Sequence, residues 1–113
     1  MENLNKVRVN VKVTSMDEAI QFYVHKLGLE LRNRFGDHYA EIDANGFIIG
    51  LHPGGASSRQ ENNVSIGFGV SRFDQTVARL GSRGIEFSVQ KDGPIRLAHF
   101  SDPDGNPLFL AEN

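Results

Sequence analysis

Two stretches of strictly alternating apolar and polar residues, 57 positions apart, constrain this chain more than any other feature of its sequence. The first runs from Val7 to Val13 and the second from Val64 to Val70. Alternation with a period of two residues is typical of a β-strand that buries one face. Because one run falls in each half of the 113 residues, the sequence predicts an internal repeat.

A short helix is predicted directly after the first run. Ser15 is a typical N-cap residue, and Glu18 stands where a capping box places an acidic residue. Apolar residues then recur at helical spacing from Met16 to Leu27. Gly28 follows, and glycine there predicts a left-handed end to the helix.

The second half repeats this order. We expect Ser71 and Asp74 to cap the second helix, and Gly84 to end it. Both helices lead into similar segments, Gly28–Leu31 and Gly84–Phe87, which we predict to be strands.

Each half closes with a predicted β-hairpin. Asn45-Gly46 separates the apolar runs 39–43 and 47–51, and Asp104-Gly105 separates 97–101 from 108–111. Asn-Gly and Asp-Gly favour tight hairpins because both residues of the turn accept positive φ. The order in each half is therefore βαβββ, and the sequence predicts an α+β fold.

The domain organisation follows from this repeat. We predict a single domain over 1–113, made of module 1 at about 5–52 and module 2 at about 63–113. A polar, glycine-rich linker over 53–62 joins the modules.

Composition excludes several classes of protein. With 12 basic against 14 acidic residues the net charge is −2, whereas nucleic-acid binding favours a basic surface. The absence of cysteine excludes disulfides, thiolate nucleophiles and Cys-ligated zinc. No apolar run exceeds four residues, far fewer than a membrane span requires. We therefore expect a cytoplasmic protein with neither nucleic acid nor membrane as its partner.

Three segments resemble a known family. MDEAIQFY at 16–23, with LGLEL at 27–31, looks like the helix and helix exit of the vicinal oxygen chelate superfamily. FSDPDGN at 100–106 is similar to the hairpin motif of that family, which includes glyoxalase I, the bleomycin-resistance proteins and extradiol dioxygenases. The resemblance implies two βαβββ modules forming a curved mixed sheet around a cup, with the helices outside.

The resemblance also implies four metal-ligand positions, usually His or Glu. By motif they fall on Arg8, Gly50, Ser65 and Phe109. Arginine brings a permanent positive charge and no available lone pair, and the other three offer no side chain, a neutral hydroxyl and a hydrocarbon ring. We therefore expect no metal, no other cofactor and no catalytic residue in the cup.

The residues that we predict to face the cup and contact a ligand are Arg8, Asn10, Tyr39, Glu41, His52, Ser65, Phe100 and Phe109. The guanidinium of Arg8 would clamp an anionic group, or it would form a structural ion pair with Glu41. Phe100 and Phe109 would provide a stacking wall, or they would belong to the core. The orientations of His52 and His99 stay open at this stage.

Of the functions that fit, we favour a metal-free small-molecule-binding protein of the bleomycin-resistance type that holds an aromatic or anionic ligand. The alternative is a lyase, isomerase or dioxygenase of the same superfamily with a divalent metal at a shifted site. A ferredoxin-like βαββαβ ligand sensor is a third hypothesis, which has fewer strands. Because exposed sheet edges favour pairing, we also expect a homodimer, with the modules side by side in one chain or exchanged about a hinge at 53–63.

Overall fold

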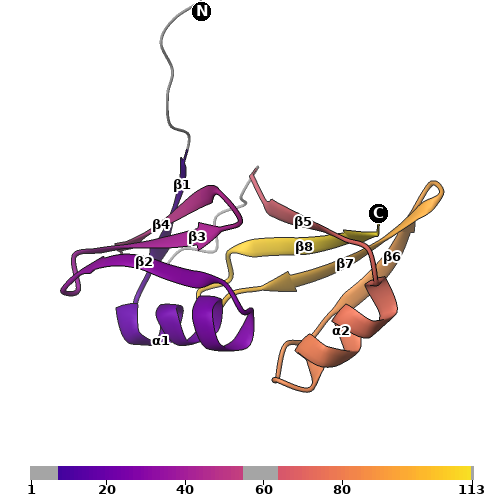
Figure 1. Ribbon diagram of the computed structural model, residues 1–113, viewed down its shortest axis with the longest axis horizontal. Coiled ribbons are helices and arrows are strands. Elements are labelled where there is room, and N and C mark those ends of the chain that lie inside the picture. The colour runs from indigo at the N-terminus through magenta and orange to yellow at the C-terminus, as the bar shows by residue number, and fades with distance from the viewer. Residues whose placement is uncertain (1–7, 55–63, 113) are drawn as a thin grey trace, which may run out of the picture. The chain divides into compact units, whose positions relative to one another are not determined.

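The computed structural model describes residues 8–54 and 64–112, and the chain divides into two compact units, one in each half (Figure 1). Each unit contains a four-stranded mixed sheet and a helical segment in the order βαβββ. The predicted α+β fold of two βαβββ modules is therefore confirmed. Most of the predicted linker lies outside the described residues, and its first residue, Pro53, ends a strand.

The elements of the first unit are β1 (Arg8–Val13), α1 (Met16–Ile20), η1 (Gln21–Lys26), β2 (Glu30–Phe35), β3 (Tyr39–Ala44) and β4 (Phe47–Pro53). The sheet has the order β1-β4-β3-β2, with β1 parallel to β4 and the other pairs antiparallel. The elements of the second unit are β5 (Ile66–Val70), α2 (Phe73–Gly81), β6 (Ser88–Asp92), β7 (Ile95–Ser101) and β8 (Pro107–Glu112). Its order, β5-β8-β7-β6, repeats the topology of the first sheet.

The first helix begins and ends as its sequence predicts. Ser15 Oγ accepts a hydrogen bond from Glu18 N at 3.2 Å, and Gly28 has a φ of 89°. Between them, α1 continues as the π-helix η1, in which Leu27 N donates to Phe22 O at 2.8 Å. The sequence pattern did not distinguish these wider turns from an ordinary α-helix.

The second helix departs from its prediction at its start. Its N-cap residue is Arg72, which makes no capping side-chain hydrogen bond, so the prediction that Ser71 caps the helix is wrong. Gly84 has the predicted left-handed conformation, with a φ of 98°. The next strand begins at Ser88 and not at Gly84, because Ile85 still bonds to the helix, with its N–H 3.3 Å from Leu80 O.

The two predicted hairpins close in different ways. Asn45 and Gly46 have φ values of 57° and 95°, as a tight Asn-Gly turn requires. In the other hairpin Gly105 has a positive φ but Asp104 does not, so a two-residue turn there was the wrong prediction. Instead the buried Asp102 carboxylate accepts hydrogen bonds from the backbone N–H groups of Asp104 and Asn106, at 2.9 and 2.8 Å.

Alternating side chains give each sheet two faces, one that is buried on the side of the helix and one on the opposite side. In β1 the side chains of Arg8, Asn10 and Lys12 are exposed, Val9 and Val11 are half-buried, and Val13 is fully buried. In the first unit the buried apolar residues are Val13, Met16, Ala19, Ile20, Phe22, Tyr23, Ala40, Ile42, Ile49 and Leu51. In the second they are Phe73, Leu80, Ile85, Ala98, Phe100, Leu108 and Leu110.

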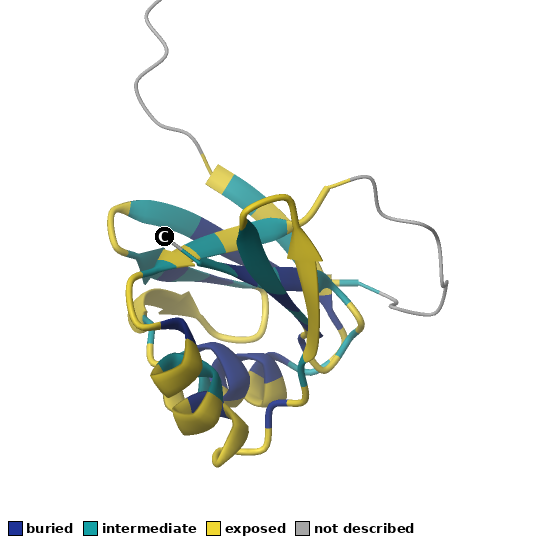
Figure 2. Cartoon of the chain, turned by 90° about the vertical axis from the view of Figure 1, so that its right-hand side faces the viewer, coloured by how far each residue is buried: buried dark blue, intermediate teal, exposed yellow. Residues whose placement is uncertain are grey.

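Each helix covers one face of its own sheet, since α1 contacts β4 and α2 contacts β8. The outer strands β2 and β6 are exposed along their whole length, unlike the central strands (Figure 2). In the ranges 8–54 and 64–112 no helix has the length and apolar character needed to cross a membrane.

Candidate functional site

The face of the first sheet opposite α1 gathers polar and aromatic side chains from all four strands. Strand register places Asn10 of β1 beside Gly50 of β4, Gly50 beside Glu41 of β3, and Glu41 beside Asn33 of β2. We call this surface the Arg8 face; its members are Arg8, Asn10, Asn33, Phe35, Tyr39, Glu41, Gly50 and His52.

A hydrogen-bonded network around Arg8 occupies this face. Arg8 Nη1 donates to Tyr39 Oη at 2.6 Å and to Glu41 Oε2 at 3.1 Å, and Tyr39 Oη donates to the same carboxylate oxygen at 3.1 Å. Asn33 Nδ2 donates to Glu41 Oε1 at 3.1 Å. Every Arg8 contact of this network goes through Nη1, so in the described part of the chain the Nε–Nη2 edge of the guanidinium has no hydrogen-bond partner.

These partners keep Glu41 ionised. The hydrogen bond from Asn33 is the main cause that lowers the pKa of the Glu41 carboxyl below its ordinary value. The Tyr39 hydroxyl and the charges of Arg8 and Arg32 act in the same direction, against the effect of partial burial. The Glu41 side chain is 19% exposed, whereas that of Arg8 is 51% exposed, so the carboxylate lies beneath and the cation faces outward.

The missing side chain at Gly50 makes room for this network. A Cβ atom placed there would overlap Asn10 Oδ1 and lie 2.9 Å from Tyr39 Oη and 3.0 Å from Tyr39 Cε1. Real Cβ atoms do not approach other atoms so closely. Glycine at this position therefore allows Tyr39 to extend across the neighbouring strand toward Arg8.

Three aromatic side chains, including Tyr39 of the network, lie next to one another on the Arg8 face. The Tyr39 and His52 rings have centroids 4.8 Å apart and planes inclined by 52°. Phe35, which is 58% exposed, pairs with Tyr39 in the register, and the two rings stack with centroids 6.3 Å apart and planes inclined by 14°. Thus a guanidinium whose Nε–Nη2 edge has no partner among the described residues lies next to an aromatic surface.

The second sheet has a corresponding face with different chemistry. Its register aligns Gly67 of β5, Phe109 of β8, His99 of β7 and Ser88 of β6. A Cβ atom at Gly67 would overlap the Phe109 ring, lying 2.8 Å from Cε1, so the ring rests directly on the glycine. His99 lies beside Phe109 with ring centroids 6.0 Å apart, which settles that the two share this face.

The structure brings together five of the eight predicted ligand-contacting residues: Arg8, Asn10, Tyr39, Glu41 and His52 lie on the Arg8 face. Phe109 lies on the corresponding face of the second sheet. One assignment needs correction. Phe100 points to the buried face, where it is 6% exposed and packs against Phe87 at 5.1 Å. Ser65 precedes β5 and is exposed, and its contact with a ligand stays a prediction.

Sequence reasoning missed Asn33 for an identifiable reason. Simple alternation puts Asn33 on the same face as Leu31, which pairs with the buried Ile42. A register irregularity between Leu31 and Asn33 shifts the strand by one residue and turns Asn33 toward Glu41. The alternation pattern contains no signal for this shift.

A family profile, described as Glyoxalase/Bleomycin resistance protein/Dioxygenase superfamily, matches residues 6–109. The chain belongs to this superfamily. A solved superfamily structure from Alicyclobacillus acidocaldarius is 26% identical, with a TM-score of 0.77, over 99% of this chain and 94% of that one. A glyoxalase family protein from Enterococcus faecalis is 23% identical over 98% of both chains (TM-score 0.75), and a fosfomycin resistance protein from Mesorhizobium loti is 14% identical over 100% and 93% (TM-score 0.76). No curated protein matches the sequence.

Superfamily members typically bind small molecules, and the resemblance implies a divalent-metal site at four motif positions. At the four motif positions, Arg8 is a cation bound to Glu41, Gly50 and Phe109 have no donor atom in a side chain, and Ser65 is exposed before β5. Within residues 8–54 and 64–112 no group of three His, Asp or Glu side chains lies close enough to hold a metal ion. The donor set therefore does not fit the ion that the superfamily implies.

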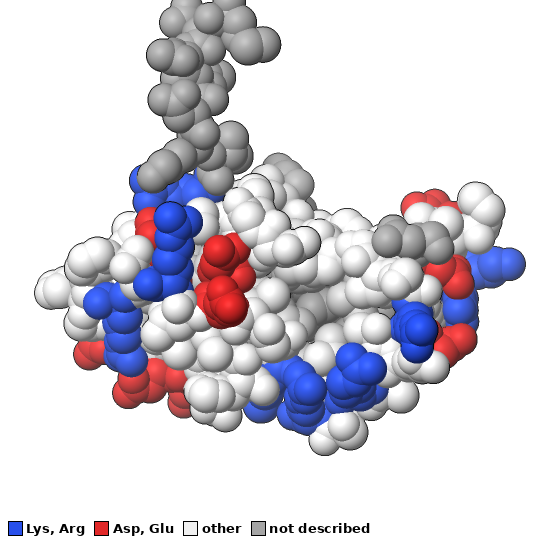
Figure 3. All heavy atoms as spheres, in the orientation of Figure 1, with Lys and Arg blue, Asp and Glu red and all other residues white. Residues whose placement is uncertain are grey.

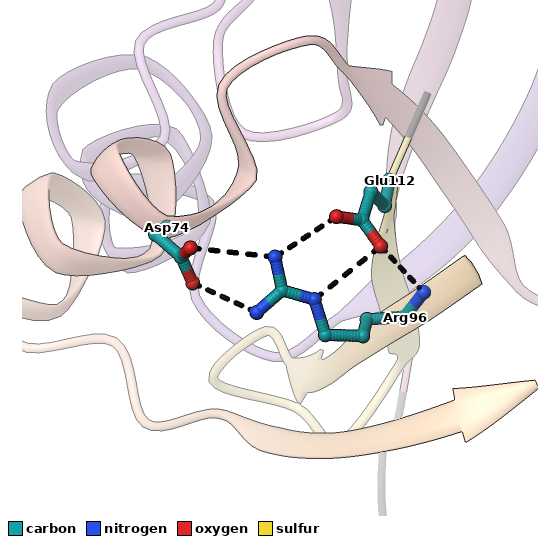
Figure 4. A network of polar contacts seen from close by, with 3 residues as sticks. All are labelled: Asp74, Arg96 and Glu112. Atoms are coloured by element: carbon teal, nitrogen blue, oxygen red, sulfur yellow. Dashed lines mark hydrogen bonds and ion pairs between the residues drawn. The ribbon is translucent and has the colours of Figure 1, made fainter. Parts of the chain in front are cut away.

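A second arginine cluster lies in the other unit (Figure 4). Arg96 of β7 binds Asp74 of α2 through Nη1 at 2.9 Å and Glu112 of β8 through Nη2 at 2.9 Å, while its Nε lies 3.3 Å from Glu112 Oε1. The guanidinium also lies 4.5 Å from the centre of the Phe73 ring. Because all three guanidinium nitrogens are bonded, this cluster fastens α2 to the sheet and has no free edge comparable to that of Arg8.

The internal repeat extends to the acidic partner of these ion pairs. Asp17 and Asp74, 57 residues apart, occupy the first turns of α1 and α2, and each binds an arginine of its own sheet. In the first unit this arginine is Arg34 of β2, whose Nη2 lies 2.8 Å from Asp17 Oδ1 and 2.8 Å from Asp37 Oδ1.

Figure 3 shows acidic and basic side chains occurring together on one surface of the protein.

Proposed function

We propose that this superfamily member binds an aromatic or anionic small molecule on the Arg8 face, without a metal ion and without catalysing a reaction. The observation that carries the proposal is the state of Arg8: one guanidinium nitrogen is held by Tyr39 and Glu41, and the opposite edge is left without a partner among the described residues. A guanidinium edge with two parallel N–H groups suits an oxyanion.

The surroundings of Arg8 support a ligand in preference to a purely structural ion pair. A structural arginine is expected to use most of its donors, as Arg96 does. Names of superfamily members refer to resistance to bleomycin and to fosfomycin, which agrees with a small-molecule ligand for this chain.

The alternative, a lyase, isomerase or dioxygenase with a divalent metal at a shifted site, has less support. Glu41 and His52 are the donors nearest to the motif positions on this face, and Glu41 already accepts hydrogen bonds from three side chains. Two donors are too few to hold a first-row ion tightly.

A thermal-shift screen of aromatic and anionic compounds tests the proposal. We expect compounds that raise the melting temperature of the wild-type protein and of Arg79→Ala, but not that of Arg8→Ala. Arg79 is a matched control because it is an exposed arginine of α2 whose side chain makes no ion pair in the described residues. Compounds that stabilise all three proteins equally, or none at all, would contradict binding at Arg8.

We also propose that the protein is a homodimer in which the two modules belong to one 113-residue domain. The sheets end at the edge strands β1, β2, β5 and β6, and exposed edges favour pairing with another chain. Light scattering is expected to give twice the chain mass of 12.5 kDa. A mass of one chain at micromolar concentration would contradict the dimer.

A further inference from the structure

The chemistry of the Arg8 face restricts which ligand it accepts. Resting on the proposed function, we infer that the ligand class is the aryl monocarboxylates: compounds with a flat aromatic ring and one carboxylate, in preference to phosphates or phosphonates that carry two negative charges.

The guanidinium edge of Arg8 that has no partner among the described residues has a defined shape. Arg8 Nη1 is committed to Tyr39 and Glu41, so the Nε–H and one Nη2–H remain as a side-on pair. Two parallel donors in one plane match the two oxygens of a carboxylate. The 51% exposure of the Arg8 side chain leaves this edge accessible to a ligand.

The charge around Arg8 limits which anion can bind. The Glu41 carboxylate lies 3.1 Å from Arg8 Nη1 and offsets part of the positive charge that an incoming anion would meet. Other charged residues also lie near this pair: Arg32 acts on Glu41, Lys12 stands beside His52, and Asp43 and Glu30 lie in the same row of the sheet as Arg8. A monoanion is attracted by Arg8 and brings only one negative charge near Glu41, whereas the second charge of a dianion would repel Glu41 at short range.

An aromatic surface lies next to the guanidinium. The centre of the Arg8 guanidinium lies 6.0 Å from the centroid of the Tyr39 ring, and the centroids of the Tyr39 and His52 rings are 4.8 Å apart. Phe35 extends the surface on the next strand. A ligand that binds Arg8 on this face is therefore bordered by aromatic side chains, and ring–ring contacts with them favour an arene over a saturated ring.

Four probes of similar size separate these requirements. They are naphthalene-2-carboxylate, its neutral carboxamide, the saturated decahydronaphthalene-2-carboxylate and 2-naphthyl phosphate, which is a dianion at pH 8. Titrations followed by NMR with the full chain are expected to show naphthalene-2-carboxylate binding at least tenfold more tightly than each of the other three.

Two variants link this preference to Arg8. Arg8→Lys keeps the charge but removes the paired donors, so naphthalene-2-carboxylate is expected to bind at least tenfold more weakly, with a retained NMR spectrum of a folded protein. Arg79→Ala is expected to bind it like the wild type.

The outcomes separate the ligand class from the proposed function. If the carboxamide, 2-naphthyl phosphate or the saturated carboxylate binds as tightly as naphthalene-2-carboxylate, or if only unrelated compounds bind in an Arg8-dependent way, the inferred class is wrong and binding at the Arg8 face stands. If no compound of the wider screen binds in an Arg8-dependent way, the proposed function fails as well.

Discussion

Gly50 of β4 leaves open the space into which Tyr39 of β3 places its hydroxyl group, since a Cβ atom at Gly50 would lie 2.9 Å from Tyr39 Oη. That hydroxyl in turn accepts a hydrogen bond from Arg8 Nη1 at 2.6 Å. The resemblance to the superfamily implies a metal-ligand position at Gly50. Here its lack of a side chain lets a tyrosine and an arginine fill the same part of the sheet.

Substituting Gly50 tests this relationship. In Gly50→Ala the new methyl group displaces Tyr39 and Asn10, so Arg8 loses one of its two anchors and ligand binding is expected to weaken at least tenfold. The atoms that must move are the ends of side chains, so overpacking is expected to cost about 1–3 kcal/mol of unfolding free energy without loss of the fold. Chemical denaturation and ligand titration measure the two effects.

Gly81→Ala is the matched control for this substitution. A Cβ atom at Gly81 meets no atom within 4 Å, so both stability and binding are expected to stay near wild-type values. Unchanged binding in Gly50→Ala would show that Tyr39 does not position Arg8.

The second sheet offers an independent test of the same packing device. Gly67→Ala pushes a methyl group into the Phe109 ring and is expected to destabilise the protein by about 1–3 kcal/mol. In a Phe109→Ala background the ring is gone, and the same substitution is expected to cost much less. A double-mutant cycle should therefore give a coupling of about 1 kcal/mol or more, and additive effects would contradict the contact.

The repeat and its alternating strands could be predicted from the sequence because a half-buried strand imposes a period of two on its residues. That pattern alone oriented Arg8, Asn10, Tyr39 and Glu41. The strong local signals, such as Ser15 as N-cap and Asn45-Gly46 as turn, were confirmed for the same reason: they depend on few neighbours.

The missed features depend on contacts between distant residues. Asn33 reaches Glu41 only because of a register irregularity in β2. His99 pairs with Phe109, so the next residue, Phe100, points to the buried face; the sequence of β7 did not show which of the two residues is buried. Asp74 was expected to cap its helix but binds Arg96, 22 residues further along the chain. Local propensity does not specify such partners.

Acidic pH is expected to weaken the Arg96 cluster. Its hydrogen bonds hold the pKa of the Glu112 carboxyl below the ordinary value of 4.5. A carboxyl whose pKa is lowered on folding stabilises the protein above its unfolded pKa, and this contribution is lost as pH falls through the lower, folded pKa. Between pH 6 and pH 3 the melting temperature of the wild type should therefore fall more than that of Glu112→Gln.

Glu86→Gln provides the comparison for that experiment, because Glu86 is an exposed glutamate of the same unit and lies outside the ion pairs of the described residues. It should follow the wild-type dependence on pH. Equal pH dependence in Glu112→Gln and the wild type would exclude a stabilising role for the Glu112 carboxylate.

Metal analysis tests the absence of a site for a divalent ion. Protein purified without chelators is expected to contain far less than one metal ion per chain, and added zinc, nickel or manganese should not raise its melting temperature. Stoichiometric metal that survives dialysis and disappears in Glu41→Ala or His52→Ala would show that the metal site of the superfamily has moved to this face.

The most direct test of ligand binding at the Arg8 face is an NMR titration of the isotope-labelled protein with naphthalene-2-carboxylate, comparing the wild type with Arg8→Ala. We expect the signals of Arg8 Nε–H, Tyr39 and His52 to shift progressively in the wild type. We expect Arg8→Ala to unfold within a few degrees of the wild type, as exposed substitutions usually do, and to show no shifts at Tyr39 and His52. Shifts confined to other residues, or shifts that persist in a folded Arg8→Ala protein, would contradict it.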